Sequence, residues 1–300
     1  QREECWEVLD MRHATAVRAR DPAERWEVRF TEAEGGSFFL DGRPSHPFTP
    51  RHAEDVPQGA LEALEDVCGV RNLSQVFIIP WAVRSIGWLG QKVISPNSVM
   101  ALGDRAVGLW TEKPEPGLKI AIPLENIAAV EDVTILLYGR LSFVPFGDRL
   151  TIRYNTVARR GMEPALLEIR KRLAGQAQSL PAFEQKTGEL PFKWKVLLEE
   201  PLVRLEKDSP VIFSSASVRG RSRREAERRQ LLVMNPYELV YLCDPVDSTQ
   251  RYGVDSVVVP RCRMTGVSEE SDKLHVASNG AHIELSIAPS LRAAAVQWMG

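Results

Sequence analysis

The sequence lacks the marks of several classes of protein. Its four cysteines are far apart and form no CxxC pair, which argues against both a zinc ribbon and a disulfide framework. No apolar run approaches the ~18 residues of a membrane span, and the segment QREECWEVLD lacks the apolar centre of a signal peptide. We therefore expect a cytoplasmic protein with reduced thiols, at most peripheral to a membrane.

Motifs for catalysis and metal binding are also missing. The five histidines are scattered without an HExxH pattern, and the chain has no GxSxG, Walker or GxGxxG motif. The acidic pairs Glu131-Asp132 and Glu199-Glu200 are each made of neighbours, which point to opposite faces of a strand. We expect no metal, no cofactor and no catalytic site. The alternative is an enzyme whose site is assembled from distant residues between two domains.

The chain has little net charge. The formal charge is −2, so no overall basic footprint supports nucleic-acid binding. Apolar residues make up 44% of the 300 residues and charged residues 26%, which is typical of a globular protein with enough core for two domains. Any electrostatic recognition must therefore come from a local patch.

One pattern is present twice. The first repeat, residues 76–173, contains VFIIPWAVRS, VISPNSVMAL, IAIPLENIAAVED, RLTIRYN and EPALLEIRKRL. The second repeat, residues 211–299, contains VIFSSASVRG, LVMNPYELVYL, VVVPRCRMTGVSE, KLHVASN and APSLRAAAVQWM. We align five pairs of positions: Val76 with Val211, Pro96 with Pro236, Pro123 with Pro260, Leu150 with Leu274, and Pro164 with Pro289. A fixed order of short motifs at drifting offsets is typical of a shared scaffold with loops of different length.

Each repeat predicts several strands followed by one helix. Apolar residues alternate with other residues over 118–122 and 150–154, so these strands are expected to bury one face. The period then changes: Leu166, Ile169 and Leu173 have helical spacing, with Pro164 expected in the first turn. The second repeat has the same change of period after Pro289.

This order of elements resembles the pleckstrin-homology (PH) fold, and more closely the bacterial PH-like domains. The resemblance rests on SPNSVMAL with IPLENIAAVED, on NPYELVYL with VPRCRMTGVSE, and on the closing helices, over residues 72–175 and 195–300. It implies a mainly β (α+β) protein with two PH-like β-barrels, each closed by a C-terminal α-helix. The expected organisation is an N-terminal α/β extension (1–70), a first domain (71–176), a linker (177–194) and a second domain (195–300).

Two further segments are expected to be ordered outside the repeats. Residues 26–40 predict a hairpin around Gly35-Gly36, and residues 59–67 predict a short helix with Leu61, Leu64 and Val67 on one face. The segment FKWKVLLEEPLVRL, after the linker, predicts an extra strand or short helix leading into the second repeat.

The first strand-to-strand loop of the second repeat is strongly basic. The segment RGRSRREAERR holds six arginines and two glutamates; the arginines are Arg219, Arg221, Arg223, Arg224, Arg228 and Arg229. The resemblance implies that Arg219, Arg221 and Arg223 would clamp phosphates, as the corresponding loop does in lipid-binding PH domains, although lysine is missing from the expected place. Arginine forks match phosphate and carboxylate oxygens. The alternatives are a solvated charged loop, an anionic lipid or acidic partner, and nucleic acid, which we do not expect.

The corresponding loop of the first repeat is apolar. Arg84, Ile86, Trp88 and Leu89 would form an interaction tip if exposed, or pack against the rest of the chain. The sequence thus predicts a non-catalytic binding or scaffold module with an unknown protein partner. The alternative is peripheral binding to an anionic membrane through the Arg219–Arg229 loop.

Overall fold

The computed structural model describes most of the two repeats and parts of the N-terminal segment. The described residues are 7–11, 14–18, 49–80, 82–85, 91–95, 98–112, 118–135, 138–145, 150–155, 159–182, 190–218, 228–245, 253–270 and 273–299. The fold is mainly β, as predicted, and every strand pair whose register is described is antiparallel. The expected hairpin over 26–40 lies outside the described residues.

The chain divides into two compact units. Unit 1 comprises residues 1–126, 137–140 and 148–166, and unit 2 comprises residues 127–136, 141–147 and 167–300. The strands form one seven-stranded, one four-stranded and one three-stranded sheet, with two two-stranded pairs. These hydrogen-bonded pairings do not close a barrel among the described residues, so the PH-like barrels stay a prediction.

Unit 1 contains a four-stranded sheet covered by one helix. The sheet order is β3-β6-β7-β8; the strands are β3 (Val76–Ile79), β6 (Ser98–Leu102), β7 (Ala106–Thr111) and β8 (Leu118–Pro123). Helix α1 (Ala60–Cys68) confirms the helix predicted over 59–67 and packs on this sheet through Leu64 and Cys68. A Cβ at Gly108 would lie 2.7 Å from the Cys68 sulfur. Only glycine therefore allows this close approach of α1 to β7.

Two strand pairs complete the described part of unit 1. Strand β1 (Glu7–Met11) pairs with β2 (Ala14–Arg18), and β4 (Ala82–Ser85) pairs with β5 (Gln91–Ser95). Strand β2 lies near β8 but is not paired with it in a sheet.

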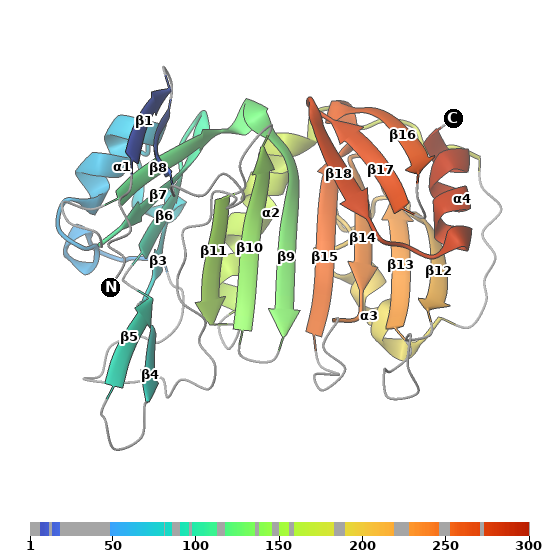
Figure 1. Ribbon diagram of the computed structural model, residues 1–300, viewed down its shortest axis with the longest axis horizontal. Coiled ribbons are helices and arrows are strands. Elements are labelled where there is room, and N and C mark those ends of the chain that lie inside the picture. Colours follow the sequence, from blue (N-terminus) through green and yellow to red (C-terminus); the bar gives the residue numbers. More distant parts are fainter. Residues whose placement is uncertain are drawn as a thin grey trace. The chain divides into compact units, whose positions relative to one another are not determined.

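The seven-stranded sheet has the order β11-β10-β9-β15-β14-β13-β12 (Figure 1). Its strands from the first repeat are β9 (Ile127–Ile135), β10 (Tyr138–Pro145) and β11 (Leu150–Asn155). Those from the second repeat are β12 (Ile212–Val218), β13 (Arg228–Met234), β14 (Glu238–Cys243) and β15 (Gly253–Pro260). Strand β9 therefore pairs with β15, a strand of the other repeat.

Unit 2 has an apolar core on each face of its β12–β15 strands. On one face lie a three-stranded sheet, β16 (Met264–Glu270), β17 (Lys273–Ser278) and β18 (Ala281–Leu285), and helix α4 (Pro289–Met299). The other face packs against α3 (Phe192–Glu199), which confirms a short helix leading into the second repeat. Strands β13 and β14 are buried on both faces, because α3 covers the face that a free-standing sheet would leave in water.

The two repeats have the same order of elements. Among the described residues, each repeat has four sheet strands, a short 3-10 helix, three strands and a helix; the first repeat has β4 and β5 in addition. The 3-10 helices, Leu124–Asn126 and Arg261–Arg263, follow Pro123 and Pro260, which supports that aligned pair. The N–H of Leu124 donates to the carbonyl of Arg105 at 2.7 Å, and the N–H of Arg261 donates to that of Tyr237 at 2.8 Å.

Three details of the expected repeat need correction. Leu150 begins β11, the last strand of its repeat, whereas Leu274 lies in β17, the second-last strand, so these positions do not correspond. Pro236 lies in the turn between β13 and β14, which corresponds to the turn between β6 and β7, whereas Pro96, itself outside the described residues, precedes β6 in the chain; these two positions do not correspond either. Helix α2 (Arg159–Ala174) begins five residues before Pro164, so this proline is inside the helix rather than in its first turn.

Candidate functional site

The basic loop of the second repeat joins the ends of two paired strands. Val218, the last residue of β12, is paired with Arg228, the first residue of β13. Arg219, Arg221, Arg223 and Arg224 lie in the connecting segment, outside the described residues. Of the predicted site residues in this loop, the structure places Arg228 and Arg229, both at the start of β13.

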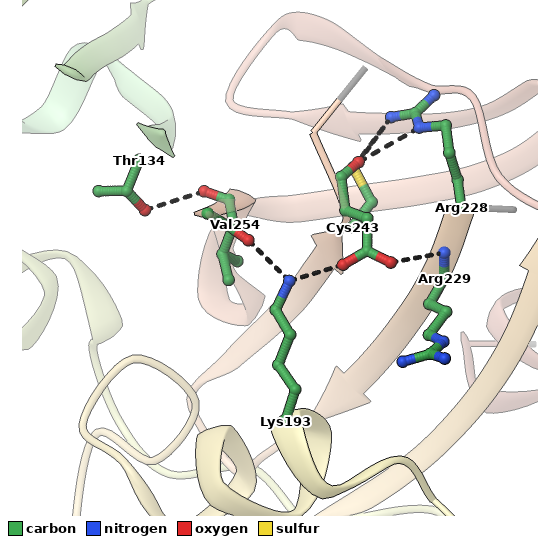
Figure 2. A network of polar contacts seen from close by, with 8 residues as sticks. Thr134, Lys193, Arg228, Arg229, Cys243 and Val254 are labelled. Carbon is green, nitrogen blue, oxygen red and sulfur yellow. Dashed lines mark hydrogen bonds and ion pairs between the residues drawn. The ribbon is translucent and has the colours of Figure 1, made fainter. Parts of the chain in front are cut away.

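A carboxylate on the neighbouring strand organises this end of the sheet. Asp244, directly after β14, accepts a hydrogen bond from the Arg229 backbone N–H at 3.0 Å through Oδ2 (Figure 2). Its Oδ1 accepts from Lys193 Nζ at 2.6 Å, and the same ammonium donates to the Gly253 carbonyl at 2.6 Å. The carboxylate thus links α3 to β13, and the ammonium of Lys193 links both to the start of β15.

The Arg228 side chain is bound to the backbone of the same residue, Asp244. Its guanidinium donates through Nε and Nη2 to the backbone carbonyl of Asp244, at 3.2 and 3.0 Å. Nη2 also lies 3.5 Å from the Cys243 sulfur. Arg229 has an exposed side chain, and Figure 2 shows it pointing away from the Arg228 guanidinium. The Arg228 guanidinium therefore bonds within the fold, whereas the charge of Arg229 is exposed to solvent.

The charge of this region is positive. Three cationic residues, Lys193, Arg228 and Arg229, lie near two carboxylates, Asp244 and Asp255, before the loop arginines are added. We call this region, Lys193 with residues 219–229 and Asp244, the cationic end. Of its described cations, Lys193, Arg228 and Arg229, Arg229 alone is exposed, and an exposed guanidinium can bind a carboxylate or a phosphate.

The polar side chains next to the cationic end do not form a nucleophile. Burial, with the nearby charge of Asp255, raises the pKa of the Cys243 thiol, so the thiol stays protonated at neutral pH. Burial also raises the pKa of Tyr241, whose hydroxyl lies 3.3 Å from the Ser286 carbonyl oxygen. Both side chains serve as buried polar packing.

The predicted apolar tip of the first repeat is not assembled into a described site. Arg84 lies in β4, which pairs with β5. Ile86, Trp88 and Leu89 lie outside the described residues. The tip therefore stays a prediction.

Two residues of the cationic end were missed by sequence reasoning. Lys193 precedes the second repeat by almost twenty residues, and Asp244 looks like an ordinary turn residue after a strand. The available signal was Asp244-Pro245 directly after ELVYLC, which predicts a strand end with a carboxylate at a hairpin edge. Nothing in the sequence links that carboxylate to Lys193.

Other features were searched over the described part of the chain. It contains no group of three or more His, Cys, Asp or Glu side chains that could hold a metal ion. None of the helices described there is long and apolar enough to cross a bilayer. His275 and His282 lie on β17 and β18 of the three-stranded sheet.

Comparison with known proteins finds no relative of this chain. No family model matches the chain, and neither a curated protein nor a solved structure matches it.

Proposed function

We propose that the protein is a non-catalytic binding module made of two PH-like barrels, and that its cationic end binds an acidic protein partner. The observation that carries this proposal is the anchoring of Arg228 and Arg229 by Asp244. It fixes one end of a loop that holds four more arginines.

The PH-like part of the proposal is supported by the duplicated order of elements. In the second repeat, four strands and three strands enclose one core, and α4 adds Leu291, Ala295 and Trp298 to it. The first repeat has the same four strands, three strands and final helix. Two strand layers and one closing helix are the arrangement expected of a PH-like barrel.

The binding part is supported by charge and by rigidity. Asp244 neutralises one positive charge of the cationic end, and the loop adds four arginines and two glutamates, so an excess of positive charge remains. Because β12 and β13 are paired up to Val218 and Arg228, the loop starts and ends at fixed points. A partner therefore has less loop entropy to remove than it would with an unanchored tail.

Binding to a polyanion tests the proposal. The probe is poly-L-glutamate, measured by fluorescence anisotropy at low and high salt. The variant changes Arg219, Arg221 and Arg223 to Ala; the matched control changes the exposed Arg51, Arg71 and Arg105 to Ala. We expect the loop variant to weaken binding at least about tenfold, whereas the control changes it little.

A vesicle arm separates the two kinds of anionic partner. Phosphatidylcholine vesicles with and without phosphatidylserine are sedimented with the same three proteins. Loop-dependent binding to poly-L-glutamate with no loop-dependent gain on phosphatidylserine supports the protein partner. Loop-dependent binding to phosphatidylserine vesicles alone replaces it with a membrane surface, since each basic residue near an anionic membrane contributes about 1 kcal/mol. Equal effects of the loop and control variants contradict both.

A further inference from the structure

Helix α3 has an apolar side that is exposed to solvent. Phe192 is 82% exposed and Val196 is 41% exposed, and Phe192 is the most exposed large apolar side chain in the described part of the chain. The two residues are four apart, and the exposed Lys195 lies three residues after Phe192, so all three are on one side of the helix. The opposite side of the helix packs into the apolar core. We call Phe192, Lys195 and Val196 the outer face of α3.

The fold does not require this apolar outer face. Helix α1 has the equivalent place before the first repeat, where it covers the β3-β6-β7-β8 sheet as α3 covers strands of the second repeat. The exposed residues of α1 include Glu62, Glu65 and Asp66, so its outward side carries carboxylates. A covering helix can therefore have an ordinary charged surface. Exposed apolar residues gathered on one side of α3 instead indicate contact with another molecule.

Arg229 lies on the same side of the sheet as α3. Side chains alternate between the two faces of a strand, and Leu231 and Val233 of β13 pack in the core with α3. Arg229 precedes Leu231 by two residues, so it faces the same side, and its side chain is exposed. Figure 2 shows this side chain extending toward the side from which Lys193 reaches Asp244.

Hydrogen bonds hold the start of α3 beside Arg229. Lys193 Nζ donates to Asp244 Oδ1 at 2.6 Å, and Asp244 Oδ2 accepts from the Arg229 backbone N–H at 3.0 Å. Phe192 is the residue before Lys193, so the exposed phenylalanine and the exposed arginine lie on either side of one short chain of contacts. The outer face of α3 therefore adjoins the cationic end.

We propose that the outer face of α3 and Arg229 form one docking surface for the acidic protein partner. The partner presents an apolar side chain to Phe192 and Val196, and carboxylates to Lys195 and Arg229. This inference rests on the proposed function and deepens it, because it makes the bound segment of the partner both acidic and apolar. Aromatic and arginine side chains together carry much of the binding energy of protein interfaces.

Charge favours a protein segment over a membrane as the occupant. Glu199 lies three residues after Val196, on the same side of α3, and its side chain is 73% exposed. A protein segment can direct its carboxylates toward Lys195 and Arg229 and away from Glu199. An anionic bilayer would bring negative charge against this carboxylate as well.

Two polymers test the apolar part of the docking surface. Poly-L-glutamate and a random copolymer of glutamate and tyrosine, matched in length, are compared by fluorescence anisotropy. Wild-type protein should bind the copolymer at least about fivefold more tightly, because its tyrosine rings can pack on Phe192. This gain should persist at high salt, since contact between apolar groups is not screened.

Substitutions on two helices locate the gain. Phe192→Ser should remove most of it and leave binding to poly-L-glutamate unchanged, and Val196→Ser should reduce it about twofold. Val296→Ser on α4 is the matched control, because Val196 and Val296 are 41% and 42% exposed, and it should leave the gain unchanged. Urea unfolding establishes that each variant is folded.

The loop variant, with Arg219, Arg221 and Arg223 changed to Ala, separates this inference from the proposed function. It should weaken binding of both polymers. If poly-L-glutamate binding depends on the loop but the copolymer shows no gain, or if the gain survives Phe192→Ser, the docking surface is wrong and the proposed function stands. If the loop variant binds both polymers as the wild type does, the proposed function fails and the docking surface fails with it.

Two other outcomes would assign the outer face of α3 to a different occupant. If Phe192→Ser lowers sedimentation with phosphatidylserine vesicles and leaves the copolymer gain unchanged, the face binds a membrane. If sedimentation velocity shows self-association of the wild type that Phe192→Ser abolishes, the face binds a second copy of the chain. Either result overturns the inference.

Discussion

Arg170 and Glu238 form a fully buried ion pair. Nε and Nη2 of Arg170 donate to the two carboxylate oxygens at 2.9 and 2.5 Å, and the side chains are 6% and 0% exposed. Nη1 donates to the Pro201 carbonyl at 2.6 Å, so one guanidinium joins α2, β14 and the segment after α3. Such a pair contributes to a specific arrangement of these elements rather than to a large net stability.

Glu238→Gln tests this pair. The change leaves the buried guanidinium of Arg170 without a counter-charge, which should lower the free energy of unfolding by about 3–5 kcal/mol. Urea unfolding measures this loss of free energy. Glu168→Gln breaks the exposed pair of Glu168 with Arg172 and serves as the control, with an expected loss below about 0.5 kcal/mol. Equal losses for the two variants would show that the buried pair is not formed.

The cysteines should differ in reactivity. Burial raises the pKa of Cys68 and of Cys243, whereas Cys262 is exposed. In a Cys5→Ser background, iodoacetamide at about pH 8 should label Cys262 first, since only an accessible thiolate reacts. Peptide mass spectrometry gives the order of labelling. Rapid native labelling of Cys243 would contradict its place in the core.

At the scale of elements, α3 is an essential cover of the second repeat. Trp194 is 1% exposed and packs with residues of β13, β14 and β15, whereas Phe192 on the same helix is 82% exposed. The helix therefore closes the sheet face opposite α4. Without it, a continuous apolar sheet face would be in contact with water.

A pair of substitutions on α3 separates the two faces. Trp194→Ala should lower the free energy of unfolding by about 3–5 kcal/mol, because it empties a filled site between the helix and the sheet. Phe192→Ser should change it by less than about 0.5 kcal/mol. Denaturant unfolding followed by circular dichroism measures both. A similar cost for the two changes would mean that α3 does not pack as described.

Several elements could be predicted from the sequence because their signals are local. The helix at α1 has apolar residues at helical spacing, and Pro123 and Pro260 mark the ends of β8 and β15. The two-faced burial of β13 and β14 could not be predicted, because it depends on α3, more than thirty residues away. Likewise, arginines marked the cationic end, but the role of Asp244 depends on strand register.

At the scale of the whole molecule, the second repeat depends on residues from the first. Its β15 strand is paired with β9, and its Glu238 is neutralised by Arg170. Both partners precede the expected linker at 177–194. The expected domain boundaries stay a prediction. The second repeat, however, makes a strand pairing and a buried ion pair with residues of the first repeat.

Fragments test this dependence. Residues 177–300 should be unstable or aggregate when expressed alone, because the edge of β15 is open and Glu238 has lost its counter-charge. Residues 127–300 keep both partners and should be more stable. Size-exclusion chromatography and thermal unfolding compare the two fragments. A monomeric, stable 177–300 fragment would show that β9 and Arg170 are dispensable.

Hydrogen exchange of the intact chain tests most directly that β9 is a structural part of the second repeat. Amides of β9 and β15 at their seam should be protected to a similar degree. Thr134→Val and Ser256→Ala together should accelerate exchange in both strands, because they remove the two hydroxyl bonds across the seam. If β9 exchanges as fast as a loop while β13 and β14 stay protected, the two repeats are not joined by this strand pair and the account is wrong.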